Sequence, residues 1–345
     1  MEDGSRDERA MRAAIELSTA VRGTTSPNPP VGAVVLDPAG RLVGQGATQP
    51  PGGPHAEVVA LRQAGERARG GTVYVTLEPC DHHGRTPPCT RALRDAGVAA
   101  VRYAVADPNP AAAGGAATLR AAGVDVRAGL LAGEVAAGPL RAWLHFARTG
   151  RPHVTWKYAA TLDGRSAAAD GTSRWLSGAE SRAEVHRLRG MVDAVVAGIG
   201  TVLADDPRLT ARTPDGALAA RQPLRVVVGF GEVPAGARVL DGAAETLRVR
   251  SHDPHAVLTT LAERGVVDVL LEGGPRVAGA FAAAGRIDRI LAYVAPLLLG
   301  AGPAALGEAG VSTVTEAHRW TVEGVTMRGG DVRISAVPAP RPGGE

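Results

Sequence analysis

The feature that most constrains the fold is a regular alternation of helical and strand patterns, in two series along the 345 residues. In the first series, apolar residues recur at helical spacing in residues 7–21, 56–69, 90–96 and 116–122. Strand patterns occupy residues 31–36, 41–46, 72–77, 101–106 and 124–127. This alternation predicts a three-layer α/β domain with a mostly parallel sheet after an opening hairpin.

Residues 130–148 have the pattern of a connecting helix, and Thr-Gly-Arg-Pro at 149–152 then interrupts the chain. We therefore predict one domain over residues 1–149, another over 150–340 and a flexible tail over 341–345. The second series has strand patterns at residues 154–162, 194–197, 224–228, 267–271 and 289–295. No internal repeat is visible in the sequence, so we expect two different α/β domains.

The composition is that of a globular protein, with 45% hydrophobic and 21% charged residues. The formal net charge is +3 and the basic residues are scattered, which does not indicate nucleic-acid binding. The N-terminus lacks a signal-peptide pattern, and no apolar stretch approaches the about 20 residues that span a bilayer. We expect a cytoplasmic protein without membrane contacts.

The two cysteines of the chain, Cys80 and Cys89, point to a metal site rather than a disulfide scaffold. With His55 they form a set of one imidazole and two thiolates, which suits zinc. Three protein ligands leave a fourth position for water, and zinc lowers the pKa of that water to about 7. Glu57 lies two residues beyond His55, where it could take the water's proton and transfer it to departing ammonia.

His-x-Glu followed by Pro-Cys and a second cysteine is the pattern of zinc-dependent nucleobase deaminases. Here eight residues separate the cysteines, where two are usual. The alternative is a purely structural zinc site with His82 or His83 as a fourth ligand, but it leaves Glu57 and the Pro-Cys junction without a role.

Longer motifs indicate a family. They are TTSPNPPVGAVV (24–35), PHAEVVAL (54–61), TLEPCDHHGRTPPC (76–89), ADPNP (106–110), KYAATLDGR (157–165), SRWLSG (173–178), GTVLADDPRLTAR (200–212), LLEGGPRVAGAF (270–281) and APLLLG (295–300). In this order they resemble the bifunctional riboflavin-biosynthesis deaminase/reductases over nearly the whole chain. The long segment between the cysteines is the specific part, because generic deaminases lack it.

The resemblance implies a cytidine-deaminase-like domain with one zinc ion, followed by a dihydrofolate-reductase-like domain that uses NADPH. The first would replace the C2 amino group of 2,5-diamino-6-(5-phosphoribosylamino)pyrimidin-4(3H)-one by oxygen. The second would reduce the ribosyl group to a ribityl chain, giving 5-amino-6-(5-phosphoribitylamino)uracil. The family also suggests a homodimer or homotetramer with small-molecule substrates, and neither nucleic acid nor membrane as a partner.

The family motifs also imply contact residues. The first substrate would be bound by Asn28, His82, Arg85, Asp107 and Asn109. The second would be held by Ser173, Arg189, Leu209, Arg212 and Glu272. The cofactor would be lined by Ala159, Trp175, Thr201, Asp205, Gly274, Pro275, Arg276, Val277, Ala278, Gly279 and Ala280.

Some of these residues have a plainer explanation. Asn28 and Asn109 each precede a proline, and turn formation alone explains them about equally well. Arg189 and Arg212 are candidates for phosphate binding because a guanidinium group matches phosphate oxygens, with ordinary surface arginines as the alternative.

Two glycine turns in the second half could approach a phosphate. Gly198-Ile199-Gly200 has Leu203 where the third glycine of a dinucleotide fingerprint belongs, which disfavours a Rossmann domain. Glycines 273 and 274, ahead of a helix expected at 277–284, would let backbone amides approach a phosphate or form an ordinary tight turn.

Lys157 is the single lysine of an arginine-rich chain. An ammonium group is compact and flexible, whereas a guanidinium is planar and hard to deprotonate. We hypothesise that Lys157 is catalytic, assisting protonation of the sugar ring oxygen during hydride delivery. Chance retention of one lysine is the alternative, and its place within KYAATLDGR favours function.

Three positions depart from the family pattern. Ser26 stands where histidine is common, Asp81 where serine is usual, and Gly229-Phe230 where many of the reductases carry Asp-Ser. The last departure leaves open an impaired reductase half, or action on a related pyrimidine in secondary metabolism. A non-enzymatic zinc-stabilised module that senses nucleotides is a further alternative, and Glu57 argues against it.

Overall fold

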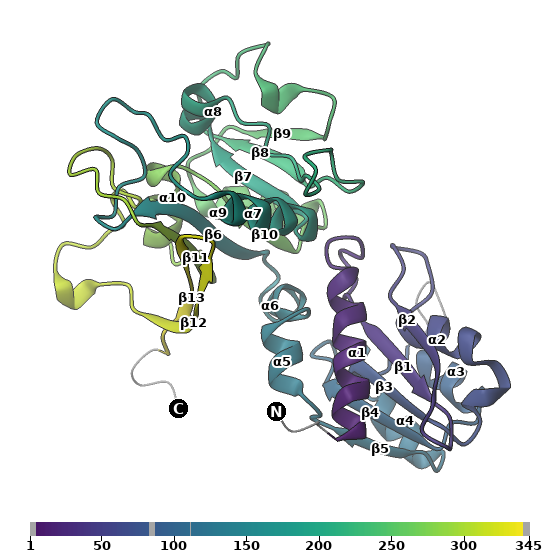
Figure 1. Cartoon of the computed structure of the whole chain (residues 1–345). Coiled ribbons are helices and arrows are strands. Elements are labelled where there is room, and N and C mark those ends of the chain that lie inside the picture. The colour runs from purple at the N-terminus through teal and green to yellow at the C-terminus, as the bar shows by residue number, and fades with distance from the viewer. Residues whose placement is uncertain (1–4, 83–86, 111, 341–345) are drawn as a thin grey trace. The chain divides into compact units, whose positions relative to one another are not determined.

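The computed structural model describes residues 5–82, 87–110 and 112–340 (Figure 1). Contacts divide the chain into two compact units, Met1–Arg151 and Pro152–Glu345. The tail expected at 341–345 lies outside the described residues. Among the helices that the structure describes, none has both the length and the apolar character needed to cross a membrane.

Unit 1 is built around a five-stranded sheet with the order β2-β1-β3-β4-β5. The strands are β1 (Gly32–Leu36), β2 (Leu42–Ala47), β3 (Thr72–Leu77), β4 (Ala100–Val105) and β5 (Asp125–Ala128). β1 pairs antiparallel with β2 and β3, whereas the pairs β3–β4 and β4–β5 are parallel. The predicted opening hairpin and parallel continuation are confirmed.

Helices cover both faces of this sheet. They include α1 (Arg6–Ala20), α2 (Ala56–Ala64) with its 3-10 extension η1 (Gly65–Ala68), α3 (Cys89–Asp95) and α4 (Gly115–Ala121). A Cβ on Gly32 would lie 2.0 Å from a backbone oxygen of α1, and one on Gly46 would lie 2.5 Å from a backbone oxygen of α2. Gly46 pairs with Ala33, the neighbour of Gly32, so these two glycines point to opposite faces. The two helices therefore enclose the sheet, as the three-layer prediction requires.

The prediction of one connecting helix over 130–148 is wrong. The structure has two helices, α5 (Ala132–Ala137) and α6 (Arg141–Thr149). Gly138 ends α5, and the proline that follows it cannot continue the helical hydrogen bonding. Trp143 is among the buried residues of α6.

Unit 2 contains an eight-stranded sheet with the order β12-β13-β11-β6-β10-β7-β8-β9. The strands are β6 (His153–Thr161), β7 (Ala194–Gly198), β8 (Leu224–Val228), β9 (Thr246–Val249), β10 (Asp268–Leu271), β11 (Arg289–Ala295), β12 (Trp320–Arg328) and β13 (Asp331–Pro338). The six strands from β11 to β9 in this order are parallel, and β13 runs antiparallel to both of its neighbours, β11 and β12. The other elements are α7 (Ala179–Met191), α8 (Ile199–Asp205), α9 (Pro254–Glu263), α10 (Pro275–Ala283) and the 3-10 turns η2 (Arg238–Leu240) and η3 (Val314–Glu316).

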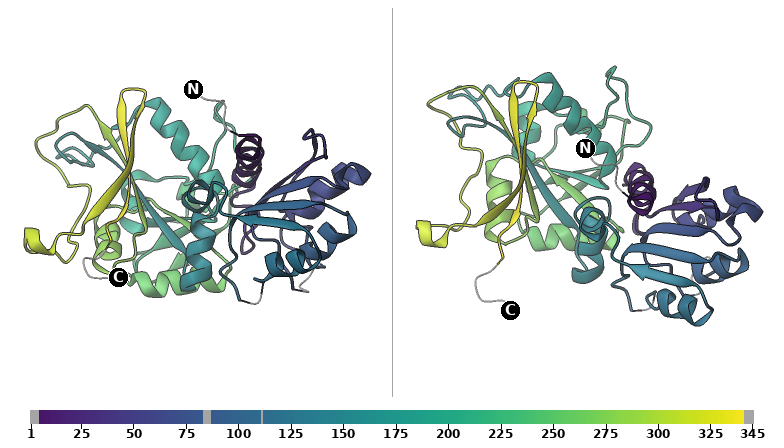
Figure 2. Two further views of the ribbon diagram at one scale, coloured as in Figure 1. Left: turned by 90° about the horizontal axis from the view of Figure 1, so that it is seen from below. Right: turned by 60° about the horizontal axis from the view of Figure 1, so that its bottom comes forward.

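Sequence analysis missed three strands of this sheet, β9, β12 and β13. β9 and β12 are the two edge strands, and most of their residues are at least partly exposed, so their apolar pattern is weak. β12 is also bulged between Val322 and Gly324, which breaks its alternation. The β12–β13 hairpin is the yellow pair of strands in Figure 2.

The parallel strands place their carboxyl ends at one edge of the sheet, where ligands of open α/β sheets bind. Buried aliphatic residues of β6, β7, β8 and β10 pack with α9 and α10 in the main core of this unit. Fully buried Arg225 on β8 donates to the Asp241 carboxylate at 2.7 Å and to the backbone oxygen of Ala244. These bonds secure the connection from β8 to β9, whose first residues reach the binding edge.

Candidate functional site

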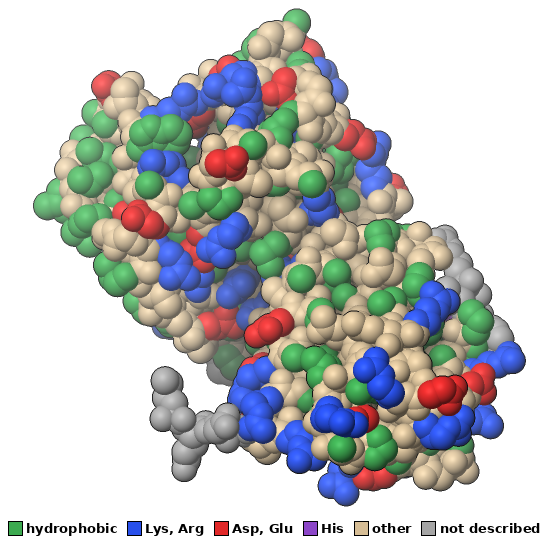
Figure 3. Space-filling model, turned by 45° about the vertical axis from the view of Figure 1, so that its right-hand side comes forward, with side chains coloured by type: hydrophobic (Ala, Val, Ile, Leu, Met, Phe, Trp, Pro, Cys, Tyr) green, Lys and Arg blue, Asp and Glu red, His purple; other side chains and the backbone are tan. Residues whose placement is uncertain are grey.

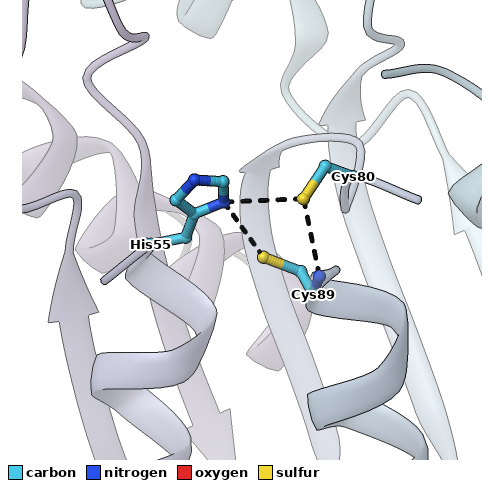
Figure 4. A group of neighbouring side chains, drawn as sticks. All are labelled: His55, Cys80 and Cys89. Carbon is cyan, nitrogen blue, oxygen red and sulfur yellow. Dashed lines mark hydrogen bonds between the residues drawn. The ribbon is translucent and has the colours of Figure 1, made fainter. Parts of the chain in front are cut away.

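Three side chains converge in unit 1 from separate elements (Figure 4). His55 Nδ1 lies 3.2 Å from Cys89 Sγ and 3.5 Å from Cys80 Sγ. All three potential ligand atoms lie within 4.8 Å of one another. They form a compact triangle of one nitrogen and two sulfur atoms.

The triangle fits zinc. Zinc binds imidazole nitrogen at about 2.1 Å and thiolate sulfur at about 2.3 Å, so ligand atoms at tetrahedral angles lie about 3.5 Å apart. The two measured nitrogen–sulfur distances are close to this value. His82 is not part of the group, and His83 lies outside the described residues. The described residues therefore offer three ligands, as in a catalytic zinc site.

Local structure explains how the ligands are held. His55 is the N-cap of α2, Cys80 follows β3, and Cys89 is the first residue of α3. The backbone N–H of Cys89 also donates to Cys80 Sγ at 3.4 Å. Hydrogen bonds from Cys89 and His55 outweigh burial and lower the pKa of Cys80 to about 4. The Cys80 sulfur is thus ready to act as a thiolate ligand.

Glu57 lies in the first turn of α2 and is almost completely buried. Burial, together with the nearby Cys80 thiolate, raises its pKa to about 6. A carboxyl group with a pKa near neutral can both accept and release a proton during one reaction. This is the property that the predicted proton-transfer role requires.

A cavity of about 230 Å³ adjoins these residues. Of the predicted substrate contacts, those that line it are Asn28, His82, Asp107 and Asn109. Arg85 lies outside the described residues. The buried Nδ1 of His82 has no hydrogen-bond partner among the described residues, which leaves it available to a bound molecule. Trp143 of α6 completes the lining, a contribution that the sequence did not reveal.

The two asparagines also form the turns considered as their alternative. The Asn28 N–H donates to the Thr25 oxygen at 2.8 Å, and the Asn109 N–H donates to the Asp107 carboxylate at 2.9 Å. Their side chains still line the cavity, so turn formation and substrate contact are compatible at both positions.

Glu78 is a cavity residue that sequence analysis passed over, although it lies in the motif TLEPC. Its carboxylate accepts from the Asp107 N–H at 3.3 Å and from the Ala116 N–H at 3.1 Å. It therefore joins the loop after β4 to α4, and holds Asp107 at the cavity wall.

Unit 2 contains a cleft of about 1470 Å³ at the binding edge of its sheet. Pockets for one drug-sized ligand measure about 300–1,000 Å³, so this cleft has room for two ligands. Most of the residues predicted to contact cofactor or substrate line it: Lys157, Ala159, Ser173, Trp175, Arg189, Thr201, Asp205, Leu209, Arg212, Glu272, Gly274, Pro275, Arg276, Val277 and Ala280.

Two residues of the predicted cofactor run are placed differently. Ala278 is fully buried in the main core of the unit. A Cβ on Gly279 would lie 2.1 Å from the backbone oxygen of Glu308, so its missing side chain permits close packing there. These two residues of α10 pack into the core and against Glu308, and they are not among the residues that line the cleft.

Glu272 is the centre of a buried charge cluster. Its two oxygens accept from Arg189 Nε at 2.6 Å and Nη2 at 2.9 Å, and Lys157 Nζ lies 3.8 Å from Oε2. Burial raises the pKa of Glu272, but the charges of Arg189 and Lys157 outweigh this and bring it to about 2. Burial and Arg189 lower the pKa of Lys157, and Glu272 opposes them. The net effect is a lowered pKa, chiefly from burial, which makes Lys157 a better proton donor than an exposed lysine.

The two arginines that are candidates for phosphate binding have different hydrogen-bond partners. Arg189 already donates to both Glu272 oxygens and to the backbone oxygen of Thr210 at 3.1 Å. Half-buried Arg212 donates only to the backbone oxygen of Gly216, at 2.6 Å, among the hydrogen bonds described for its side chain. Arg212 is therefore the better placed of the two for a phosphate.

An aromatic pair that sequence analysis did not assign also lines the cleft. Phe230 is 56% exposed, and its ring meets that of His252 edge to face at 5.0 Å. Gly229 has φ +122°, and a Cβ there would lie 2.8 Å from Ile199 Cγ2. An aspartate at this position would be strained, so the departure from Asp-Ser matches the local backbone.

Comparisons with known proteins decide the family. Residues 152–334 match the RibD C-terminal domain, and residues 4–105 match the cytidine and deoxycytidylate deaminase zinc-binding region. The chain is 59% identical over 330 residues to riboflavin biosynthesis protein RibD of Mycobacterium tuberculosis, covering 96% of this chain and 97% of that protein. It is 38% identical to RibD of Escherichia coli, covering 96% and 100% of the two. The chain belongs to the RibD family.

Solved structures agree with the assignment to the RibD family. The RibD structure from Acinetobacter baumannii matches with a TM-score of 0.84 and 36% identity, covering 97% of this chain and 99% of that one. A diaminohydroxyphosphoribosylaminopyrimidine deaminase/5-amino-6-(5-phosphoribosylamino)uracil reductase from Thermotoga maritima matches with a TM-score of 0.88 and 34% identity, covering 97% and 99%.

RibD proteins are bifunctional enzymes of riboflavin biosynthesis, with a zinc-dependent deaminase and an NADPH-dependent reductase. The predictions of family, fold class, activity and cofactors for this chain are therefore confirmed. A role in secondary metabolism is not favoured. Figure 3 shows Lys and Arg side chains interspersed with Asp and Glu over the visible face.

Proposed function

We propose that the cavity of unit 1 deaminates 2,5-diamino-6-(5-phosphoribosylamino)pyrimidin-4(3H)-one at C2. The proposal rests chiefly on Glu57, which is buried two residues from His55 and has a pKa raised to about 6. His55, Cys80 and Cys89 would hold the zinc ion. Zinc bound there supplies a Lewis acid that makes water a nucleophile at neutral pH.

Glu57 would take the proton of the attacking water and deliver it to the departing amino group. His82, whose Nδ1 has no partner among the described residues, and Asn28 would orient the pyrimidine, and Asp107 and Asn109 would contact it from the loop after β4. Because the cavity is only about 230 Å³, it suits the ring, and the phosphoribosyl group would extend out of it. Arg85 remains the family-based candidate for contacting that group.

The unit 2 cleft would then reduce the ribosyl group of the deaminated product. NADPH supplies the hydride, which C1′ of the ribosyl group accepts. The C1′–O4′ bond breaks, its electron pair stays on O4′, and Lys157 donates a proton to O4′. Glu272, which Arg189 holds through two hydrogen bonds, pairs with Lys157 at 3.8 Å, and Arg212 would bind the substrate phosphate.

Strand order supports a direction for the cofactor along the cleft. Lys157 lies on β6 and Glu272 follows β10, whereas Thr201 follows β7 and Phe230 and His252 follow β8 and β9. Neighbouring strands are about 4.8 Å apart, so the β6-to-β9 edge is about as long as an extended dinucleotide. The nicotinamide would lie near Lys157, the phosphates near Thr201 and Gly274, and the adenine near Phe230.

The other predicted contacts follow from this direction. Ala159, Trp175, Asp205, Pro275, Arg276, Val277 and Ala280 would line the cofactor, and Ser173 and Leu209 would contact the substrate. Ser173 donates to the Asp205 carboxylate at 3.1 Å, which joins the two sets. We also propose that the chain forms a homodimer or homotetramer, which light scattering of the purified protein tests.

One assay tests both halves. The diaminopyrimidine substrate is added to zinc-loaded protein with NADPH, and ammonia release and NADPH oxidation are followed separately. The Glu57→Gln variant should keep its zinc but lose both signals, and NADPH oxidation should return when the deaminated intermediate is supplied. Ammonia release at the wild-type rate by this variant would refute the role of Glu57.

A further inference from the structure

A carboxylate immediately beyond Cys80 bridges the segments that carry the two cysteines. Asp81 accepts from the hydroxyl of Thr90 at 2.6 Å and from the hydroxyl of Thr118 at 2.6 Å. Thr90 directly follows Cys89, and Thr118 lies on α4. One side chain thus joins both cysteine segments to the neighbouring helix.

Other contacts make this joint rigid. The Thr90 N–H donates to the Cys80 backbone oxygen at 3.3 Å, and the Asp81 N–H donates to the Ala112 oxygen at 3.3 Å. On α4, a Cβ on Gly115 would lie 1.8 Å from the backbone oxygen of Pro79. The start of α4 therefore packs directly on the residue before Cys80, which fixes Thr118 relative to the cysteine segment.

The chemistry of this joint favours aspartate over serine at position 81. A carboxylate has two oxygens, and here each accepts one threonine hydroxyl. Hydrogen bonds to a charged acceptor are shorter and roughly twice as strong as neutral ones. A serine has a single oxygen on a shorter side chain, so it could not replace both bonds.

We propose that Asp81 is a positioning residue that holds Cys80 and Cys89 at the separation zinc requires. This inference rests on the zinc ligands assigned under the proposed function. Side chains that orient metal ligands through hydrogen bonds typically change metal affinity about 10- to 100-fold when they are removed. Asp81 acts here on the segments beside the ligands, through Thr90 and Thr118.

The test compares zinc affinity and metal geometry in wild type, Asp81→Ser, Asp81→Asn and Thr118→Val, using the full-length protein. Competition with a chromogenic chelator should show zinc affinity about 10- to 100-fold lower in Asp81→Ser, with a smaller loss in Thr118→Val. Cobalt-substituted Asp81→Ser should show an altered absorption spectrum, because the tetrahedral sulfur–nitrogen geometry is relaxed. Asp95→Asn is the matched control, since Asp95 is an exposed carboxylate on α3 that pairs only weakly with Arg91 at 3.6 Å.

A merely structural role would give a different result. In that case Asp81→Ser would lower the thermal stability of the zinc-free and zinc-bound proteins equally, and zinc affinity and the cobalt spectrum would match wild type. That outcome overturns the proposal. Cys80→Ser separates this failure from a failure of the ligand assignment, because retention of zinc by Cys80→Ser would refute the assignment itself. Asp81→Asn, which keeps one acceptor oxygen, covers the case in which Asp81→Ser does not fold.

Discussion

The zinc site and the reductase cleft hold their ligands differently: the first uses a few residues close in sequence, and the second uses many residues spread along the chain. The zinc site gathers its three ligands from residues 55–89, at two helix starts and one strand end, beside a cavity of about 230 Å³. The cleft collects residues from 157 to 305, many of them on or just after five parallel strands, around about 1470 Å³. A compact site depends on every member, whereas a distributed cleft shares binding among many. Substitutions should therefore act abruptly in the first and in graded steps in the second.

The largest effect is expected for Cys80→Ser. Loss of one of three protein ligands should remove zinc and abolish ammonia release, because the nucleophile is no longer activated. NADPH oxidation with the deaminated intermediate should stay at the wild-type rate. Metal analysis and the two separate assays check this, and impaired reduction in a folded variant would contradict the independence of the two sites.

Lys157→Arg should be the most damaging change in the cleft. A guanidinium cannot release its proton, so we expect reduction to fall about 10²- to 10⁴-fold, the usual range for a general acid. Ammonia release should be unchanged. NADPH oxidation in single-turnover experiments is the measurement, and full reductase activity in this variant would reject a catalytic Lys157.

Glu272→Gln should affect stability in a pH-dependent way. The pKa of Glu272 lies at about 2 in the folded protein against an ordinary 4.5, so its ionised form stabilises the fold. That contribution is complete above pH about 4.5 and is lost as pH falls toward about 2. The variant leaves Arg189 and Lys157 without their carboxylate, which should cost about 3–5 kcal/mol at neutral pH.

Urea denaturation of wild type and Glu272→Gln at several pH values, with unfolding of unit 2 as the signal, tests this pH-dependent contribution of Glu272. The gap in unfolding free energy between wild type and variant should narrow as pH falls below 4.5. Glu245→Gln is the control, because Glu245 is an exposed partner of Arg264 at 3.0 Å and should contribute little. A gap that stays constant with pH would show that the Glu272 charge does not stabilise the fold.

The smallest effect is expected for Phe230→Ser, which removes the exposed aromatic ring from the cleft. If the adenine stacks on Phe230, the KM for NADPH should rise about 5- to 150-fold, since stacking on an aromatic ring is worth about 1–3 kcal/mol. The kcat should change little. A lower KM in Phe230→Ser would mean instead that Phe230 marks a lost polar contact and an impaired reductase half.

The site in unit 1 could be predicted more completely than the cleft. His55, Glu57, Cys80 and Cys89 belong to a motif whose chemistry restricts the residue types, and the structure brings the three ligands together. Glu78 and Trp143 were missed because carboxylates and aromatic residues occur for many reasons, and only their position at the cavity marks them. In the cleft, Arg189 resembled Arg212 in sequence, and their separate surroundings became visible only in the structure.

What the sequence determined by itself is the order of the two α/β domains, the metal ligands and the family, because these depend on periodicity and on residue types at short spacing. The tertiary structure decided the edge strands β9 and β12 and the pairing of Asp81 with Thr90 and Thr118. It also decided which residues face the cleft. These features depend on strand order and packing between distant segments, and such contacts leave no periodic trace along the chain.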